Sequence, residues 1–190
     1  MSFASVALAE HSPQQRTGWV PADHDDSYVY RLPYADAVSY SVLQSYGSSF
    51  SHRGTEYFTV DFGMPEGTLV YSAREGIVIR TEERFATSCW HDRCDSFANF
   101  VEIRHEDGTV ARYFHLQQSG VLVETGQRVA RGEPIGYSGD TGYATVPHLH
   151  FGVYRKAADG AEQSIAVRFG VRGGVIGPLR NGGRYTNAVD

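Results

Sequence analysis

Short β-type runs separated by glycine-containing turns recur along this 190-residue chain from about residue 57 onward. Each run is only a few residues long and is rich in Val, Ile, Tyr, Phe and Thr, which favour strands. The turns between them carry Gly, Asp and Pro, and the chain holds 21 glycines. We find no run with the period of an amphipathic helix. The pattern predicts an all-β fold built from antiparallel sheets of short strands.

The chain divides into two regions by composition. Residues 1–27 are expected to be a flexible N-terminal segment, because from residue 10 onward they are polar, contain proline and show no period. Residues 28–190 are expected to form a single domain, because a chain of this length suits one packed unit. The predicted strands are 28–34, 39–46, 57–62, 68–72, 76–81, 100–105, 109–116, 127–130, 134–137, 148–154 and 164–169.

Composition and charge argue against nucleic-acid binding and against a transmembrane segment. Hydrophobic residues make up 41% and charged residues 21% of the chain, which is ordinary for a globular protein. The formal net charge is -5, and no run of Lys and Arg could follow a phosphate backbone. No apolar stretch approaches the roughly 20 residues that span a bilayer. We therefore expect neither nucleic-acid binding nor a transmembrane segment, and no pattern indicates the oligomeric state.

Two features favour export. The small-x-small pattern at residues 7–9 resembles the end of a secretory signal peptide, although the basic segment that usually precedes it is missing. Cys89 and Cys94 flank four residues and could close a small disulfide loop, which is the commoner state in an oxidising compartment. A structural metal pair is the alternative, but no second Cys or Cys/His pair completes it. A secreted or periplasmic location is predicted.

Two histidines and an aspartate are unusual for the strands in which they lie. His148 and His150 point to one face of an extended strand, whereas Leu149 and Phe151 point to the other. The shared partner of the two imidazoles could be a metal ion, a carboxylate, a substrate or water. Asp61 lies within an aromatic and β-branched run, where a carboxylate is costly to bury unless it is paired or binds a cation.

The eight histidines fall into two groups. Those without an assembled context are His11, His24, His91 and His105, and the last is expected to form a local hydrogen bond at a hairpin turn. Those at strand ends or in a glycine-containing loop are His52, His115, His148 and His150. Catalytic zinc commonly has three ligands from the His, Asp and Glu set and leaves one position for water. Further histidines beside that water can transfer protons near neutral pH.

Three motifs in this order resemble the lysostaphin-type or LytM-type zinc endopeptidases of bacterial cell walls. They are SH at 51–52 followed by VDFGMPEGT at 60–68, YFHL at 113–116 and PHLHF at 147–151. Residues 126–142 are also similar to the hairpin that connects the last two motifs in that family. The resemblance covers about residues 51–154, and its specificity comes from the order of the motifs.

The resemblance implies a LytM-like, duplicated hybrid motif-like domain with a cleft that holds one zinc ion (Zn²⁺). The zinc ligands would be His52, Asp61 and His150, and His115 and His148 would be an unligated catalytic pair. Zinc would lower the pKa of its bound water and polarise the scissile carbonyl. One free histidine would take the water proton, and the other would stabilise the oxyanion or protonate the leaving amine. The implied function is hydrolysis of peptidoglycan peptides, at stem cross-links or bridges.

The chain departs from the commonest family pattern at two places. The first histidine ligand usually lies four residues before the aspartate, and Tyr57 occupies that position here. His52 instead lies nine residues before Asp61, as in a family branch with a longer excursion, and Gly54 could let that loop fold back. Val146 stands where glycine is usual before the last motif.

Other functions compete with hydrolysis. A catalytically silent module of the same fold could bind cell wall or activate another hydrolase, but such modules usually lose ligands or free histidines. Residues 129–132 resemble the carrier hairpin of biotinyl or lipoyl domains, yet the only lysine, Lys156, lies outside it. A metal-free adhesin leaves Asp61 and the His-Leu-His pair without a role. The sequence favours the zinc endopeptidase.

Overall fold

The computed structural model describes residues 27–156 and 160–188. The predicted lead-in, apart from Ser27, and the signal-like pattern at residues 7–9 lie outside the described residues. Within the described ranges, no helix is long and apolar enough to cross a membrane.

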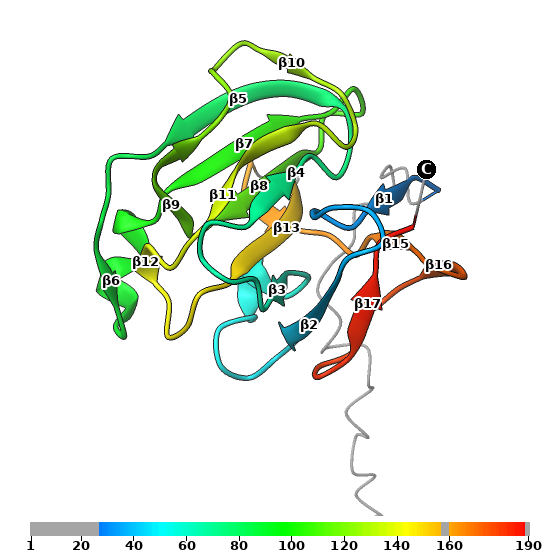
Figure 1. The fold of residues 1–190 in the computed structure, drawn as a ribbon, viewed down its shortest axis with the longest axis horizontal. Coiled ribbons are helices and arrows are strands. Elements are labelled where there is room, and N and C mark those ends of the chain that lie inside the picture. The colour runs from blue at the N-terminus through cyan, green and yellow to red at the C-terminus, as the bar shows by residue number, and fades with distance from the viewer. Residues whose placement is uncertain (1–26, 157–159, 189–190) are drawn as a thin grey trace, which may run out of the picture.

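Nearly all regular structure in the described residues is β (Figure 1). Two short 3-10 helices interrupt the strands, η2 at Gly54–Glu56 and η3 at Asp92–Phe97. The prediction of an all-β fold is confirmed. The strands are β1 Val29–Arg31, β2 Ser39–Gln44, β3 Val60–Phe62, β4 Leu69–Tyr71, β5 Gly76–Glu82, β6 Ser88–Cys89, β7 Phe100–Arg104, β8 Val110–Phe114, β9 Leu116–Val121, β10 Arg128–Val129, β11 Pro134–Ser138, β12 Gly142–Tyr143, β13 Leu149–Lys156, β14 Glu162–Ser164, β15 Arg168–Val171, β16 Gly174–Ile176 and β17 Arg184–Thr186.

A nine-stranded sheet forms the centre of the fold. Its order is β10-β5-β7-β8-β13-β3-β2-β17, and β14 pairs with β13 beside this path. Each pair within this sheet is antiparallel. The hairpin of β7 and β8 follows from an Asp-Gly turn between two alternating β-branched and aromatic runs. Strand β13 lies between β8 and β3 and therefore joins distant parts of the chain.

Three smaller sheets complete the architecture. One has the order β4-β11-β9, a second has β1-β15-β16, and the third pairs β12 with β6. The β1–β15 and β12–β6 pairs are parallel, whereas the sequence pattern predicts antiparallel sheets. Parallel pairing is open to these strands because long connections separate them, so no tight hairpin dictates their direction.

Several predicted strands differ in extent from those observed, and two of them show the reason. The strand expected at 57–62 starts only at Val60, because η2 and a turn occupy the preceding residues. The strand expected at 164–169 is divided between β14 and β15. Ser164 pairs with Tyr154 of β13, whereas Arg168 pairs with Val29 of β1, so the chain passes from one sheet to another. Neither boundary is encoded in the local alternation of apolar residues.

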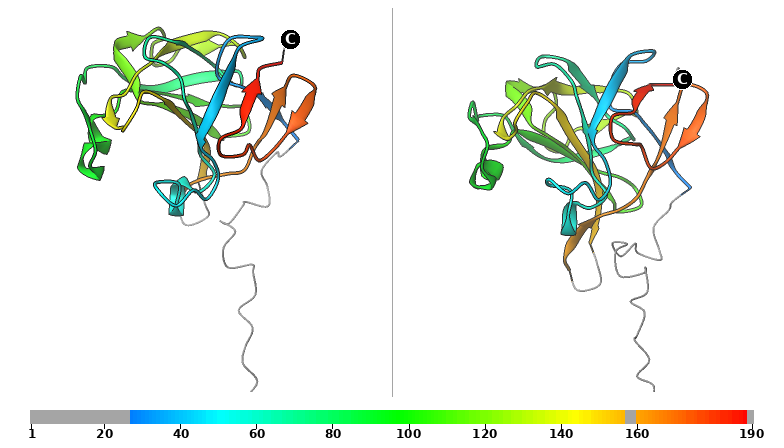
Figure 2. Two further views of the ribbon diagram at one scale, coloured as in Figure 1. Left: turned by 60° about the horizontal axis from the view of Figure 1, so that its bottom comes forward. Right: turned by 90° about the horizontal axis from the view of Figure 1, so that it is seen from below.

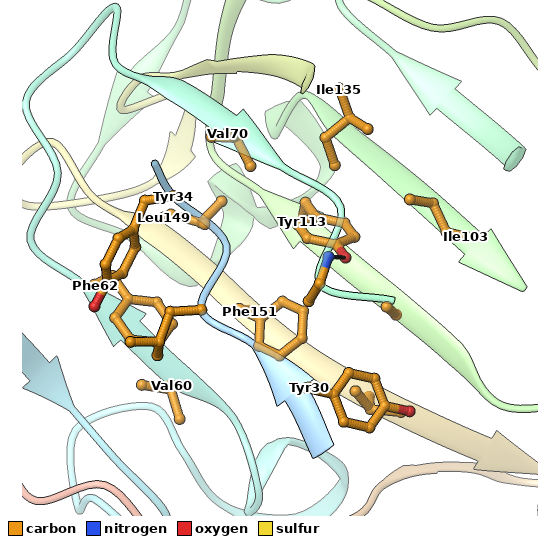
Figure 3. Close-up of a cluster of buried hydrophobic side chains, with 14 of the residues drawn as sticks. Tyr30, Tyr34, Val60, Phe62, Val70, Ile103, Tyr113, Ile135, Leu149 and Phe151 are labelled. Atoms are coloured by element: carbon orange, nitrogen blue, oxygen red, sulfur yellow. Dashed lines mark hydrogen bonds between the residues drawn. The ribbon is translucent and has the colours of Figure 1, made fainter. Parts of the chain in front are cut away.

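The hydrophobic core lies between the central sheet and its neighbours (Figure 3). Phe62 of β3 and Phe151 of β13 face Val70 and Ile135 from β4 and β11, and these four side chains are at most 1% exposed. The Tyr113 hydroxyl accepts a hydrogen bond from a backbone N–H in the loop after β4, at 2.8 Å. Burying each large apolar side chain contributes roughly 1.5–3 kcal/mol. The face of β13 opposite to its histidines is thereby fixed in the core.

The C-terminal strands pack beside the N-terminal ones (Figure 2). Strand β15 pairs with β1, and β17 pairs with β2 at the edge of the central sheet. Phe169 of β15 is fully buried, and its ring lies 6.3 Å from that of Phe62 and 5.9 Å from that of Phe151. The C-terminal segment therefore shares the core that supports β3 and β13.

Candidate metal centre

The backbone pairing of three strands brings the chemical groups of the site together. Asp61 of β3 pairs directly with His150 of β13, and His150 pairs on its other side with Phe114 of β8. Gln44 of β2 pairs with Asp61, which extends the row across the sheet. Directly paired residues point to the same face. His115 follows Phe114, and its ring centroid lies 5.9 Å from that of His150.

Two imidazoles converge on one carboxylate oxygen. His52 Nε2 lies 3.1 Å from Asp61 Oδ1, and His150 Nδ1 lies 2.8 Å from the same oxygen. One ligand atom from each of the three residues lies within 4.8 Å of the other two. Among the described residues, this is the one group of three or more His, Cys, Asp or Glu side chains close enough to hold a metal.

The chemistry of these residues fits a zinc ion. The His52 side chain is fully buried, and its Nε2 has no hydrogen-bond partner. Its Nδ1–H donates to the Ser45 carbonyl at 3.1 Å, which leaves the Nε2 lone pair directed toward Asp61. A buried, unpartnered acceptor is costly unless a ligand satisfies it. Two imidazoles and one carboxylate are the donor set of a catalytic zinc site with one open position.

Asp61 is held as an ionised carboxylate. It is 3% exposed, and Gln44 Nε2 donates to its Oδ2 at 2.7 Å, which leaves Oδ1 for the two histidines. Burial by itself raises the pKa of Asp61, but the interactions with the rings of His150 and His52 outweigh burial and hold that pKa well below its usual range. The site therefore presents a fixed negative charge to a cation.

His150 lies between two carboxylates. Its Nδ1 faces Asp61, whereas its Nε2 lies 3.5 Å from Glu56 Oε2. Although burial lowers the pKa of His150, Asp61 and Glu56 outweigh this effect and raise it to about 10. Metal binding at Nδ1 requires loss of a proton from this ring, because an imidazolium has no free lone pair.

A second pair of histidines lies beside the cluster. The ring centroids of His115 and His148 are 4.6 Å apart, and His148 Nε2 lies 3.9 Å from Asp61 Oδ1. Each ring donates Nδ1–H to a backbone carbonyl, at 2.7 Å to Thr141 and 2.8 Å to Val146. These bonds fix the tautomer in which Nε2 carries the lone pair. Burial, together with the charges of His148 and His150, lowers the pKa of His115 to about 3, so His115 is uncharged at neutral pH.

His115 also has a strained backbone. Its φ of 63° lies in the left-handed region, which non-glycine residues seldom adopt. The conformation occurs where β8 ends and β9 begins, and it costs about 1–3 kcal/mol. Such strain persists only where the surrounding structure enforces it. Here it accompanies a side chain that joins the cluster.

The structure brings all five predicted site residues together, and it places His148 and His150 on the same side of β13. These residues are His52, Asp61, His115, His148 and His150. Sequence reasoning missed Gln44 and Glu56, because only strand register and the fold of an excursion bring them to Asp61 and His150. The unusual nine-residue spacing between His52 and Asp61 was the one signal in the sequence that this excursion exists.

The backbone of His105 forms the expected local hydrogen bonds at the hairpin turn, with Thr109 and Gly108, but its ring has a distant partner. Its ring is buried, and Nδ1–H donates at 2.7 Å to the carbonyl of Glu75, thirty residues away, rather than to a local partner. The two cysteines form a disulfide between Cys89 and Cys94. Strand β6, which contains Cys89, pairs with β12, and β12 directly follows Thr141. The disulfide loop thus lies against the segment that holds His115.

A match to a family model identifies the relationship of this chain to known proteins. The description of that model is peptidase family M23, and it matches residues 55–163, more than half of the chain. This chain belongs to peptidase family M23. The matched range starts three residues after His52 and therefore does not include it. The place of His52 beside Asp61 in the M23 chain rests on the structure instead.

Individual relatives agree with the family. The M23 chain is 41% identical over 100 residues to the peptidoglycan DD-endopeptidase ShyA of Vibrio cholerae serotype O1, which covers 53% of this chain and 19% of ShyA. It is 30% identical over 144 residues to lysostaphin of Staphylococcus simulans, which covers 71% of this chain and 27% of lysostaphin. The chain thus spans only about a fifth to a quarter of the length of these relatives.

A solved structure supports the same relationship. The crystal structure of a zinc-containing peptidase from Vibrio cholerae has a TM-score of 0.50 and 30% identity to the M23 chain, and it covers 66% of this chain and 36% of that one. The resemblance to lysostaphin-type and LytM-type peptidases, predicted from three motifs, is confirmed. The expected zinc cofactor also agrees with the family, with this solved relative and with the His/Asp/His cluster.

Proposed function

We propose that this chain is a zinc-dependent endopeptidase that hydrolyses peptide bonds of bacterial peptidoglycan, at stem cross-links or bridges. One observation carries the proposal: a His/Asp/His ligand set lies beside two further histidines whose Nε2 atoms bear lone pairs. A site that only stored a metal needs no such pair. The similarity to ShyA, a peptidoglycan DD-endopeptidase, supports the substrate class.

We assign the zinc to His52, Asp61 and His150. When bound, zinc supplies a Lewis acid that polarises the scissile carbonyl and makes a water molecule more acidic. The Asp61 carboxylate offsets the charge of the cation, and Gln44 holds the second carboxylate oxygen. The backbone bond from His52 Nδ1 keeps that ring from turning its Nε2 away.

His115 and His148 are the proposed catalytic pair. Both rings are anchored through Nδ1, so both present Nε2 to the same space beside Asp61. One imidazole takes the proton of the attacking water at its Nε2. The other, once protonated at Nε2, stabilises the developing oxyanion or protonates the leaving amine. His115 is uncharged at neutral pH, so its Nε2 carries a lone pair.

The proposed place of action is the cell envelope, in the periplasm or outside the cell. Peptidoglycan lies there, and the relative ShyA is a peptidoglycan DD-endopeptidase. The Cys89–Cys94 disulfide suits an oxidising compartment.

Mass spectrometry of soluble products tests the proposed reaction. The zinc-loaded protein is incubated with purified peptidoglycan of two kinds, one with direct stem cross-links and one with glycine bridges. We expect new peptide termini that the wild type makes and that a His150→Ala variant does not. The identity of those termini names the bond. If neither wall yields products while the wild type still binds zinc and wall, the alternative of a catalytically silent wall-binding or hydrolase-activating module replaces this proposal.

Zinc titration tests the ligand assignment at its most unusual position. We expect His52→Ala to weaken zinc binding by more than the roughly 100-fold that loss of an outer partner causes, since a direct ligand is removed. Tyr57→Phe, at the position where the first histidine usually lies, is expected to leave zinc affinity unchanged. Competition with a chelating dye measures both. Equal zinc retention by His52→Ala and the wild type would contradict the assignment.

A further inference from the structure

The excursion, which is the segment between His52 and Asp61, places the Glu56 carboxylate beside His150. It lies on the side of that ring that faces away from Asp61. Glu56 Oε2 lies 3.5 Å from His150 Nε2, whereas Nδ1 of the same ring lies 2.8 Å from Asp61 Oδ1. The two ring nitrogens therefore face different carboxylates. A histidine that binds metal through one nitrogen almost always donates the N–H of the other to a carboxylate, carbonyl or water.

The excursion is fixed rather than loose. Gly54, with a φ of 56°, begins the 3-10 helix η2, which ends at Glu56. Thr59 closes the turn, because its hydroxyl and its backbone N–H both donate to the Glu56 carbonyl, at 2.7 and 3.3 Å. The N–H of Phe58 donates to Ser164 Oγ of β14 at 2.9 Å. These bonds hold the backbone of Glu56 against the strand next to β13.

A buried tyrosine holds the side chain of Glu56. The Tyr154 hydroxyl donates to Glu56 Oε2, the same oxygen that faces His150. Tyr154 is 2% exposed, and the guanidinium of Arg112 lies 4.2 Å from the centre of its ring. Tyr154 also lies four residues after His150 on β13, so one strand carries both partners of the carboxylate.

Two simpler roles for Glu56 are weaker. The first is an exposed ion pair, which contributes little to stability. The Glu56 side chain is 38% exposed, but its partner His150 is only 14% exposed and Tyr154 is buried, so the contact is not a surface ion pair. A fourth metal ligand would have to face the His150 nitrogen that faces Asp61. Glu56 faces the other nitrogen instead and leaves the open position of the site free.

We propose that Glu56 is a positioning residue for His150: its carboxylate accepts a hydrogen bond from Nε2–H and orients the ring with Nδ1 toward the zinc. Tyr154 holds that carboxylate in place. This inference rests on the ligand role proposed above for His150. It gives the longer spacing between His52 and Asp61 a function, because the additional residues include the outer partner of the third ligand.

Zinc affinity of the purified protein, measured by competition with a chelating dye, tests this inference without any substrate. We expect Glu56→Ala to weaken zinc binding by about 10- to 100-fold. Glu56→Gln keeps an acceptor oxygen and is expected to lose less affinity than Glu56→Ala. Tyr154→Phe frees the carboxylate and should also weaken binding. Glu106→Ala serves as the matched control, because Glu106 is exposed in the turn before β8, at the opposite end of that strand from His115.

Two further readouts separate positioning from a structural role. The absorption spectrum of the Co²⁺-loaded protein should change in Glu56→Ala and return toward that of the wild type in Glu56→Gln. Thermal unfolding of the metal-free protein should be similar for Glu56→Gln and the wild type. Zinc affinity within twofold of the wild type in both Glu56 variants would overturn the inference.

His150→Ala distinguishes the two levels of the proposal. If His150→Ala binds zinc as well as the wild type does, the ligand assignment fails, and the role of Glu56 fails with it. If His150→Ala loses zinc while Glu56→Ala does not, only the positioning role is wrong.

Discussion

The state of each imidazole depends on which of its two nitrogens is already occupied. Backbone carbonyls occupy Nδ1 of His52, His115 and His148, so each of these rings offers Nε2 to the site. His150 is reversed and directs Nδ1 toward Asp61. Neighbouring hydrogen bonds thus decide which ring nitrogen each histidine presents to the site.

Replacing His115 by alanine should separate metal binding from catalysis. We expect equimolar zinc binding to be retained, because His115 is not one of the proposed ligands, and kcat to fall by about 10²- to 10⁴-fold through loss of proton transfer. Metal analysis and single-turnover hydrolysis of a defined wall peptide measure the two quantities. Unchanged turnover in this variant would eliminate His115 from the mechanism.

At the scale of elements, the segments on which the site depends are short, and contacts with neighbouring segments hold them in place. Strand β12 has only two residues, yet the preceding Thr141 carbonyl fixes the tautomer of His115. The disulfide-closed loop supports this segment through the β6–β12 pair and through a hydrogen bond from Gly142 N–H to the Thr87 carbonyl at 2.8 Å. Within η3, Cys94 is the one buried residue. The loop therefore relies on its covalent link more than on packing.

Removing the disulfide should loosen this loop more than the core. The Cys89–Cys94 link closes a loop with a sequence separation of 5, for which the chain-entropy account gives about 2 kcal/mol. We expect Cys89→Ser/Cys94→Ser to lower the free energy of unfolding by up to that amount and to make residues 86–98 the first site of proteolysis. Urea denaturation and peptide mapping check this. The reduced wild type should behave like the double variant, and equal protease resistance of the oxidised wild type and the variant would contradict the prediction.

At the scale of the whole molecule, one core connects both ends of the described chain to the site. Phe169 of β15 packs on Phe62 and Phe151, whose strands β3 and β13 carry Asp61 and His150 on the opposite face. We therefore propose that residues 28–190 fold as one domain rather than as a catalytic core with a separate tail.

Truncating Phe169 tests this cooperativity. Because its side chain is fully buried, we expect Phe169→Ala to cost about 3–5 kcal/mol in the free energy of unfolding. The transition should remain single, with far-UV and near-UV circular dichroism changing together. Two separate transitions in the wild type would show instead that the C-terminal strands unfold independently.

The stability of the molecule should also depend on pH through His105. Burial lowers the pKa of His105 to about 4 from its usual value near 6.5. Between these values the unfolded chain binds a proton that the folded protein excludes. The stabilisation is therefore complete above about pH 6.5 and is lost as the pH falls toward 4, by up to about 3 kcal/mol.

Urea denaturation at several pH values between 7.5 and 4 measures this dependence. We expect His105→Gln to show a shallower decline than the wild type over that range, because its amide does not titrate and can still donate to the Glu75 carbonyl. Other buried histidines contribute to both proteins, so the difference between the two curves isolates His105. Parallel curves would contradict the prediction.

The sequence by itself determined the fold class and the chemical groups of the site. Alternating β-type runs and glycine turns are local patterns, so they indicated an all-β chain. The order of the His and Asp motifs indicated a resemblance to lysostaphin-type or LytM-type zinc peptidases. Tertiary structure decided the parallel pairing of β1 with β15, the ring nitrogen that each histidine presents, and the contacts of Gln44 and Glu56. The physical reason is distance along the chain: Asp61 and His150 are separated by 89 positions, and only the register of β3 on β13 makes them neighbours.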